Sequence, residues 1–362
     1  MMVTKDVRSG KPAIQLLEVG KAYGHITAVD RVSLAIGRGE FVTLLGPSGT
    51  GKTTILMMIA GFIIPTTGHV LLAGKDVTPT PPHRRNLGVV FQNYALFPHM
   101  TVFDNVAYPL WMRGMRSRET SLRVGEALAL VQLTEKADRF PRQLSGGEQQ
   151  RVALARAFVF SPSALLMDEP LGALDRKLRE QVQIEIRSLQ RRLGITTVHV
   201  THDQEEAFTM SDRVVVLNRG RVEQVGTPRE VYDQPATSFV AEFVGESNFW
   251  HGTIQRQSDG QHVLVTASGE RFPLPQRSYT PGRPVRMTVR PEMIRLRAES
   301  SEPAYAAGTV LDAMYIGGVT KYLVSTKDGQ VVKVVTQGEA PERDAHVTLT
   351  WDPGALHLYQ EE

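Results

Sequence analysis

The chain has 362 residues, of which 41% are hydrophobic and 22% charged, and it contains no cysteine. This length predicts two or three domains, and the missing cysteines exclude disulfides, a Cys-ligated zinc site and a thiol nucleophile. The formal net charge is only +3, with a slight positive excess in residues 1–244 and a slight negative excess in residues 245–362, so we expect no concentrated basic face for nucleic acid.

The first two-thirds of the chain alternates strand-like and helix-like segments. The expected strands are Ile14–Val19, Val32–Ile36, Phe41–Leu45, Leu87–Phe91, Ala164–Met167, Thr196–Val200 and Arg213–Leu217. The expected helices are Thr53–Gly61, Arg118–Leu133, Gly147–Phe158 and Lys177–Leu193. Short apolar strands that alternate with helices predict an α/β domain built on a largely parallel sheet.

From about Gly245 the pattern changes to short β-rich runs separated by glycine and proline. These runs are His262–Thr266, Val285–Val289, Lys321–Ser325 and Val331–Val335. Closely spaced strands with turn residues between them predict a small barrel or sandwich. We therefore expect two domains, residues 1–244 and residues 245–362.

Neither a membrane helix nor a secretory signal is visible in the sequence. No apolar run approaches the ~18 residues that a membrane-spanning helix needs. The segment from Met1 to Lys11 is polar and no apolar stretch follows it. The expectation is a soluble, cytosolic protein.

A glycine-rich segment follows the expected strand Phe41–Leu45. It fits the phosphate-loop pattern, a glycine, four residues, then Gly-Lys-Thr, through Gly46, Pro47, Ser48, Gly49, Thr50, Gly51, Lys52 and Thr53. Glycines let backbone N–H groups converge on an anion, and the helix that follows points its positive end at the phosphates. In such a loop Lys52 reaches the β- and γ-phosphates and the Thr53 hydroxyl binds Mg²⁺.

Two carboxylates, Asp168 and Glu169, follow the expected strand Ala164–Met167. By itself, an apolar run before Asp-Glu-Pro is typical of a strand that leads into a turn. In a chain with a phosphate loop it predicts a hydrolytic site, because α/β sheets bind ligands at the carboxyl ends of their strands. Asp168 is then expected in the Mg²⁺ shell, and Glu169 as the general base that activates water.

A third motif overlaps the start of the expected helix Gly147–Phe158 and comprises Ser145, Gly146, Gly147 and Glu148. Alone, it predicts an ordinary helix N-cap by Ser145. Beside a phosphate loop it predicts a second anion site, since a capped helix N-terminus also suits a phosphate. Two chains arranged head to tail would then complete two nucleotide sites by two-fold symmetry.

With these motifs, the chain resembles the ATP-binding subunit of an ABC transporter, whose signature sequence matches Leu144–Gly147. The resemblance implies a P-loop NTPase (RecA-like) core, a helical subdomain at about residues 93–160, and an all-β, OB-like TOBE domain after residue 244. It also implies that Thr54 belongs to the ATP-binding loop and that Ser145 to Glu148 bind ATP in trans. Further implied roles are adenine stacking by Tyr23, Mg²⁺ and water contacts by Gln92, a γ-phosphate contact by His202, and a dimer-crossing loop at Leu171–Asp175. Taken singly, Tyr23 also fits a turn aromatic and His202 a loop histidine.

An apolar cluster follows Gln92 and consists of Tyr94, Leu96, Phe97 and Met100. In the family this region begins the subdomain that receives a short helix from the membrane subunit. Aromatic anchors suit helix-in-groove docking. The alternative is that these residues form the core of the subdomain itself, and we expect a mixture of the two.

The resemblance also implies cofactors, partners and location. The cofactors are ATP and Mg²⁺, and the partners are a second copy of the chain, two integral-membrane permease subunits and a periplasmic or extracellular solute-binding protein, with no nucleic acid. The chain would lie on the cytoplasmic face of the inner membrane. Segments Pro82–Asn86 and Pro98–Val102 are most similar to spermidine/putrescine import ATPases. The alternatives are the same role with iron(III), sugar or sulfate as cargo, or a non-transport ABC ATPase that acts on nucleic acid.

Position 148 departs from the family pattern, because relatives in this subgroup commonly carry glutamine where this chain has Glu148. A carboxylate in the first helical turn favours the helix dipole. It also adds negative charge near a bound phosphate, so its effect on nucleotide binding is left open by the sequence.

Overall fold

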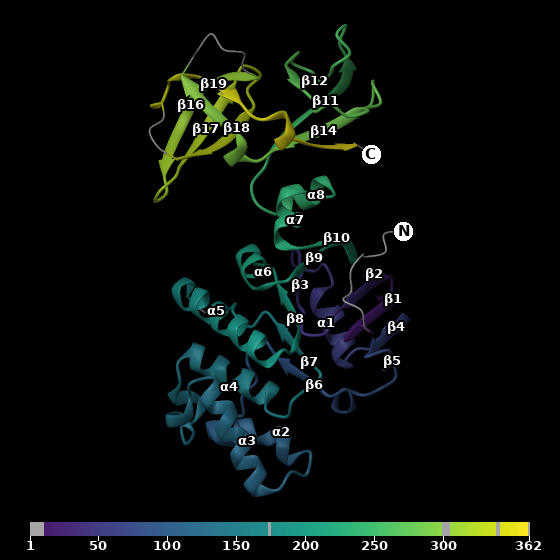
Figure 1. Ribbon diagram of the computed structural model, residues 1–362, viewed down its shortest axis with the longest axis vertical. Helices are drawn as coiled ribbons and strands as arrows, with labels where there is room; N and C mark the ends of the chain where they lie inside the picture. Colours follow the sequence, from purple (N-terminus) through teal and green to yellow (C-terminus); the bar gives the residue numbers. More distant parts are fainter. Residues whose placement is uncertain (1–10, 173–174, 299–304, 338–340, 361–362) are drawn as a thin grey trace. The chain divides into compact units, whose positions relative to one another are not determined.

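The computed structural model describes residues 11–172, 175–298, 305–337 and 341–360 (Figure 1). The chain divides into two compact units, one that ends at Val231 and one that begins at Tyr232. The expected domain boundary near Val244 lies inside the second unit and stays a prediction. Within the described ranges, no helix combines the length and the apolar character that crossing a bilayer requires.

A six-stranded, mostly parallel sheet forms the centre of the first unit. Its strands, in spatial order, are β10 (Arg221–Gly226), β9 (Arg213–Asn218), β3 (Phe41–Leu45), β8 (Thr196–Thr201), β7 (Ala164–Asp168) and β6 (Leu87–Val90). Leu45 pairs with Thr201, and Asp168 pairs with Val200. The carboxyl ends of β3, β8 and β7 therefore meet at one edge, where an α/β sheet places its ligands.

The two faces of this sheet are covered by different layers (Figure 1). On one face, α1 (Lys52–Ala60) and an antiparallel sheet share a core with alternate strand residues such as Val42 and Leu44. That sheet has the order β2 (Ile26–Ile36), β1 (Ile14–Tyr23), β4 (Thr67–Leu72) and β5 (Lys75–Asp76). On the other face, Phe41, Val90 and Met167 pack with the helical layer. Because both faces are covered, β3 and β7 read as continuous apolar runs.

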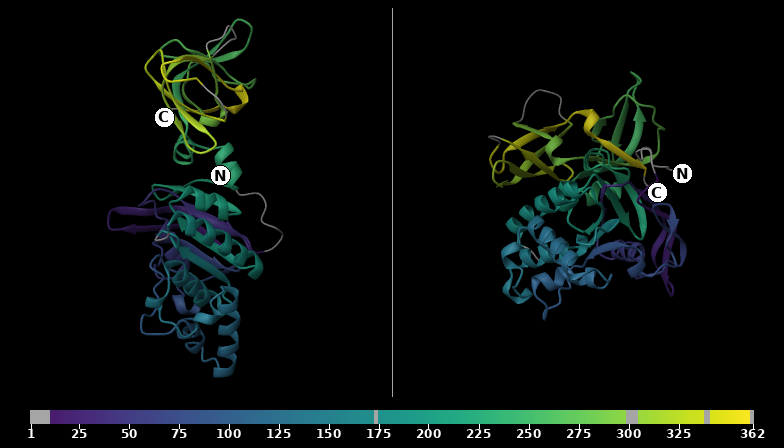
Figure 2. Two further views of the ribbon diagram at one scale, coloured as in Figure 1. Left: turned by 90° about the vertical axis from the view of Figure 1, so that its left-hand side faces the viewer. Right: turned by 60° about the horizontal axis from the view of Figure 1, so that its bottom comes forward.

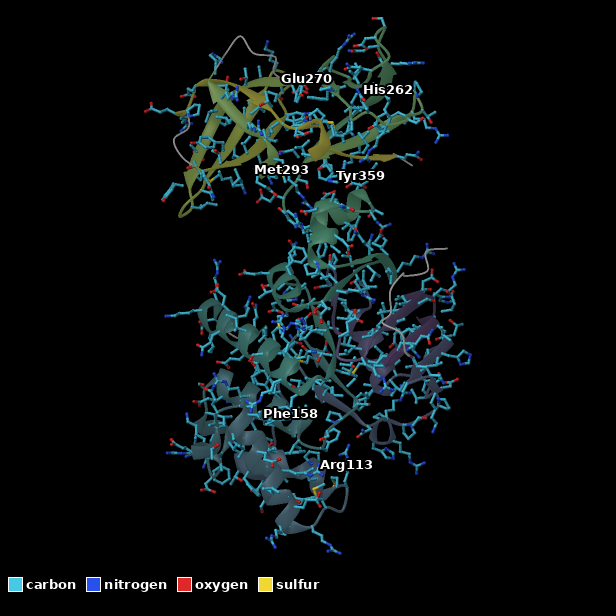
Figure 3. All side chains as sticks on the ribbon, in the orientation of Figure 1. Arg113, Phe158, His262, Glu270, Met293 and Tyr359 are labelled. Atoms are coloured by element: carbon cyan, nitrogen blue, oxygen red, sulfur yellow. The ribbon has the colours of Figure 1, made fainter. Side chains whose placement is uncertain are left out.

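The helical layer contains α2 (Val102–Trp111), α3 (Ser117–Leu130), α4 (Gly146–Phe158) and α5 (Arg176–Leu193). Helix α2 was not predicted, although a capping box between Thr101 and Asp104 marks its start and Pro109 lies inside it. Helix α3 ends three residues before its expected end, and Gln132 then adopts a left-handed φ of 57°. Arg113 lies in the turn after α2 (Figure 3). Its guanidinium is 3.7 Å from the centre of the Phe160 ring.

Three shorter helices follow in the chain: α6 (Gln204–Met210), α7 (Pro228–Asp233) and α8 (Ser238–Phe243). The second unit then continues as two five-stranded antiparallel sheets. One has the order β13 (Arg271–Pro273), β12 (His262–Thr266), β11 (Asn248–Arg256), β14 (Pro284–Val289) and β20 (His357–Gln360). The other has the order β15 (Arg295–Ala298), β19 (His346–Thr350), β16 (Ala306–Tyr315), β17 (Thr320–Thr326) and β18 (Val331–Thr336).

The strands of the two C-terminal sheets curve around one another (Figure 2, left), and their side chains share one hydrophobic cluster. Trp250 and Phe272 from one sheet pack with Trp351, with ring centroids 5.3–5.5 Å apart. Val324 and Leu349 of the other sheet belong to the same cluster. The all-β architecture expected for this region is confirmed.

Candidate nucleotide site

The phosphate-loop segment connects the fully buried strand β3 to helix α1. A side chain at Gly46 would place its Cβ 2.5 Å from the carbonyl oxygen of Leu217, and one at Gly51 would lie 2.5 Å from that of Ala28. Gly49 and Gly51 also have left-handed φ values of 81° and 91°. The path of the loop therefore requires glycine at these positions.

The N-terminus of α1 is suited to an anion. Its N-cap residue Gly51 provides no side-chain hydrogen bond, and no acidic residue occupies the first turn, Lys52 to Ile55. The first N–H groups of a helix lack intrahelical partners, and the helix dipole favours negative charge there. The remaining loop residues Pro47, Ser48, Thr50 and Thr54 lie in the same segment, and Thr50 Oγ1 donates to the Pro47 carbonyl at 2.9 Å.

The side chain of Lys52 is folded over the loop and is only 5% exposed. Its Nζ donates to the carbonyl oxygens of Gly46 and Pro47, at 2.7 and 2.8 Å. Burial lowers the pKa of Lys52, while the nearby carboxylates of Glu169 and Asp168 raise it. A cation that is held by carbonyl oxygens at a helix N-terminus is placed to take a phosphate as its partner.

Two of the three predicted Mg²⁺ ligands meet at the end of β7. Thr53 Oγ1 donates to Asp168 Oδ1 at 2.9 Å. Burial raises the pKa of Asp168, and the hydrogen bond from Thr53 acts in the opposite direction. Gln92 is exposed and follows the neighbouring strand β6, which pairs with β7. Hydroxyl, carboxylate and amide oxygens are hard donors, so this set of residues fits Mg²⁺.

Glu169 and His202 form the next pair, although they follow different strands. His202 Nδ1 lies 3.3 Å from Glu169 Oε1. The N–H of Glu169 donates to the Val200 carbonyl at 3.0 Å, and Glu169 holds a left-handed φ of 43°. Such a conformation costs a non-glycine residue about 1–3 kcal/mol and is found where surrounding structure enforces a functional geometry.

The turn that carries His202 is held by residues that the sequence analysis missed. Asp203 accepts the N–H groups of Glu205 and Glu206 and pairs with Arg179 Nη1 of α5 at 3.1 Å. The local signal was present, since an aspartate before a helix is a common N-cap. The partner Arg179 lies 24 residues away, and no short-range pattern indicates it.

Two histidines near this edge differ sharply in environment. His199 on β8 is fully buried, its Nδ1 lies 3.3 Å from Thr43 Oγ1, and burial lowers its pKa to about 3. The side chain of His202 is 58% exposed at the site. His199 is therefore a neutral core residue, and His202 is the histidine available to a ligand.

Tyr23 lies at the end of β1, 49% exposed, with Lys21 Nζ 5.2 Å from the centre of its ring. It contacts none of the loop residues by a hydrogen bond within the described ranges. The connection is indirect, because β1 pairs with β2 and the β2 residue Ala28 contacts Gly51. The exposed ring is free to stack on a planar ligand.

The signature segment lies apart from the phosphate loop in the hydrogen bonds of the described residues. Ser145 caps α4 by accepting from the N–H of Glu148 at 3.4 Å, and Ser145 and Gly146 are exposed. Gly147 is buried against Leu178 of α5. Across residues 11–172 and 175–298, no hydrogen bond links this segment to the loop. Of the predicted interface loop, Ala173 and Leu174 lie outside the described residues, while Asp175 caps α5.

The apolar cluster after Gln92 belongs mainly to the core. Tyr94 is only 7% exposed and lies in the same hydrophobic cluster as α2, α3 and α4. Arg156 donates to the Tyr94 and Ala95 carbonyls at 2.7 and 2.8 Å. Phe97 is half-buried and packs 4.7 Å from the Tyr108 ring. Tyr94 is therefore no exposed docking anchor, because its side chain fills the core of the helical layer.

Comparison with known proteins places these features in a family. Residues 29–172 match the ABC transporter family model, and residues 287–358 match the TOBE domain model. The chain is similar to the "Spermidine/putrescine import ATP-binding protein PotA" of Acidothermus cellulolyticus, with 48% identity over 96% of this chain and 94% of that protein. It is also similar to the protein of that name from Rubrobacter xylanophilus, with 50% identity over 95% and 93% of the two chains.

A solved structure leads to the same family. The dimeric structure of the bacterial ABC transporter cassette MJ0796 is 36% identical to this chain, with a TM-score of 0.54. The match covers 60% of this chain and 99% of the cassette. A second structure of that cassette is described as a post-hydrolysis state with bound ADP and phosphate. The predicted resemblance and the predicted fold class are confirmed.

Proposed function

Because the chain belongs to the ABC transporter family of ATP-binding subunits, we propose that it hydrolyses ATP to drive the import of a polyamine through separate membrane subunits. Support comes from relatives that are named spermidine/putrescine import ATP-binding proteins and that match nearly the whole chain. The same relatives disfavour iron(III), sugar or sulfate as cargo, and also a role on nucleic acid.

The observation that carries the proposed chemistry is the meeting of four side chains at one sheet edge. Thr53 contacts Asp168, and His202 contacts Glu169. Both carboxylates are close enough to Lys52 to raise the pKa of its ammonium. The phosphates bind the N–H groups at the start of α1, and the Lys52 ammonium exchanges the carbonyls of its own loop for phosphate oxygens. Thr53, Asp168 and Gln92 would hold Mg²⁺, which shields the charge of the phosphates.

Glu169 supplies the general base in this proposal. Its carboxylate accepts the proton of the attacking water, a contribution worth about 10²–10⁴-fold in rate. His202 fixes the orientation of that carboxylate and reaches the γ-phosphate. The strained backbone at Glu169 keeps the side chain at the site edge, since its N–H is bonded to β8.

A second copy of the chain completes each site. Ser145 and Gly146 are exposed at the start of α4, without a hydrogen bond to the loop of their own chain in the residues described. In a two-fold dimer they bind the phosphates held by the partner chain. Closing and reopening of this dimer then moves two permease subunits, and a periplasmic or extracellular binding protein delivers the cargo. The chain would be peripheral to the cytoplasmic face of the membrane.

The test uses the purified full-length chain. Replacing Glu169 by Gln is expected to preserve ATP binding and to reduce turnover by about 10²–10⁴-fold. The matched control is Glu126→Gln, which makes the same change on the exposed side of α3. Undiminished hydrolysis by Glu169→Gln would refute the assigned base.

A second measurement tests the dimer and the cargo. The specific activity of the unaltered chain should rise with protein concentration and depend cooperatively on ATP, because each chain supplies only part of each nucleotide site. In the complex reconstituted with its permease and binding protein, spermidine or putrescine should stimulate hydrolysis. Activity that is independent of concentration contradicts the dimer, and stimulation by a sugar or sulfate alone contradicts the cargo.

A further inference from the structure

An ion pair lies beside the signature segment and involves a residue that no motif includes. Lys136 Nζ contacts Glu148 Oε1. Lys136 ends the 3₁₀ turn η2 (Thr134–Lys136), twelve residues before its partner. It comes from the connection between α3 and α4, so its contact with the start of α4 is made by the tertiary fold.

The backbone around Lys136 is fixed by the neighbouring helix α2. The N–H of Phe103 donates to the Ala137 carbonyl at 2.8 Å, and the N–H of Val102 donates to the Arg139 carbonyl at 2.8 Å. These two bonds hold the turn against the first residues of α2. These bonds fix the backbone of Lys136 at a position from which its side chain reaches Glu148.

Glu148 has two tasks at the start of α4. Its Oε2 accepts the N–H of Ser145 at 3.0 Å and so completes the capping box, while its Oε1 faces Lys136. The hydrogen bond from Lys136, followed by that from the Ser145 amide, holds the pKa of Glu148 below its ordinary value. A full negative charge thus persists at neutral pH beside a helix end that the proposed function assigns to the phosphates of the partner chain.

The carboxylate of Glu148 has two opposite effects at the start of α4, and Lys136 offsets the unfavourable one. A carboxylate in the first turn strengthens the cap, but it repels a phosphate at the same helix end. We propose that Lys136 is a positioning residue for nucleotide binding in trans, where its ammonium neutralises Glu148 and keeps it on the Ser145 cap. This inference rests on the proposed function of a paired ATPase.

The pair is too exposed to matter much for folding. The side chain of Lys136 is 43% exposed and that of Glu148 is 25% exposed, and exposed ion pairs contribute little to stability. Removing Lys136 is therefore expected to leave the fold intact and to change the electrostatics at the tip of α4. That separation makes the inference testable in the full-length chain.

The experiment measures ATP hydrolysis against ATP concentration for a cycle of variants. Lys136→Ala should raise the ATP concentration for half-maximal rate by roughly 3- to 10-fold, with little change at saturating ATP, and the effect should shrink as salt is added. Glu148→Gln alone removes the charge that Lys136 balances and should shift this concentration by less than Lys136→Ala does. Adding Glu148→Gln to Lys136→Ala should reverse most of the shift caused by Lys136→Ala, and Lys136→Arg should retain the unaltered value.

The matched control is Arg118→Ala, which removes an exposed positive charge from α3. If the unaltered chain hydrolyses ATP cooperatively but Lys136→Ala and Arg118→Ala need the same ATP concentration for half-maximal rate, the role assigned to Lys136 is wrong. The proposed function would stand in that case. A double variant as impaired as Lys136→Ala also overturns it, because Lys136 would then act without Glu148. Absence of hydrolysis by the unaltered chain overturns the proposed function and this inference together.

Discussion

Two glycines of the phosphate loop provide a matched pair of substitutions with different expected costs. Gly49 and Gly51 share a left-handed backbone, with φ values of 81° and 91°. A Cβ at Gly49 meets no atom within 4 Å, whereas a Cβ at Gly51 lies 2.5 Å from the Ala28 carbonyl oxygen and 3.0 Å from Val29 Cγ2. The pair therefore separates backbone strain from steric overlap.

The magnitudes follow from these distances. Alanine in the left-handed region costs roughly 1–2 kcal/mol, offset by about 0.4–1 kcal/mol because alanine restricts the unfolded chain. Gly49→Ala should therefore lower the free energy of unfolding by about 0–1.6 kcal/mol. Overlap with a backbone oxygen adds about 1–3 kcal/mol, so Gly51→Ala should lower it by about 1–4.6 kcal/mol.

Urea unfolding followed by circular dichroism at 222 nm measures the difference, because the long helices α1–α5 all lie in the first unit. The urea concentration at the midpoint should fall further for Gly51→Ala than for Gly49→Ala, at an unchanged slope. ATP binding should also be weakened more by Gly51→Ala. Equal midpoints for the two variants would show that β2 yields to the new methyl group, and the steric argument would be wrong.

Three further predictions concern the site and its surroundings. Gly147→Ala should change the free energy of unfolding by less than about 1 kcal/mol, since the nearest atoms to its Cβ would be the two Leu178 methyl groups at 3.3 Å, on a flexible side chain. Hydrolysis should nevertheless fall at least about tenfold if the position receives a partner's phosphate, and unchanged hydrolysis argues against that role. Lys52→Ala should weaken ATP binding in a direct titration. Its thermal unfolding midpoint should stay the same or rise, because a buried ammonium is removed. Unweakened ATP binding would contradict the assignment of Lys52 to the phosphates. The pKa of His199 is about 3, below the ordinary value of about 6.5, so only the unfolded chain takes up this proton between those values. Stability should thus fall as the pH drops through this window, by up to about 1.4 kcal/mol per pH unit, and His199→Gln should flatten that part of the curve; an unaltered slope assigns the acid sensitivity to other groups.

The elements that sequence patterns predicted well are local. Strand β3, the loop and α1 follow one another in a single stretch whose glycines, lysine and apolar run each indicate the same structure. The meeting of Glu169 and His202 was also accessible, because both follow strands that a parallel sheet places side by side.

The features that sequence patterns missed depend on context or on distant partners. Helix α2 was not predicted. Pro109 argues against a helix in this stretch, although its position near the C-terminal end leaves most of the hydrogen bonds intact. The contacts Arg179–Asp203 and Lys136–Glu148 join separate elements, and neither has a short-range pattern. Tyr94 was ambiguous between groove and core until its burial was known.

The left-handed backbone at Glu169 has a consequence for laboratory evolution of this chain. Glycine and asparagine tolerate that conformation better than glutamate does, so a screen that rewards heat resistance alone will favour them at position 169. If Glu169 is the general base that we propose, the surviving variants would be more stable but would hydrolyse ATP far more slowly. A selection for thermal stability should therefore also measure ATP turnover in each round.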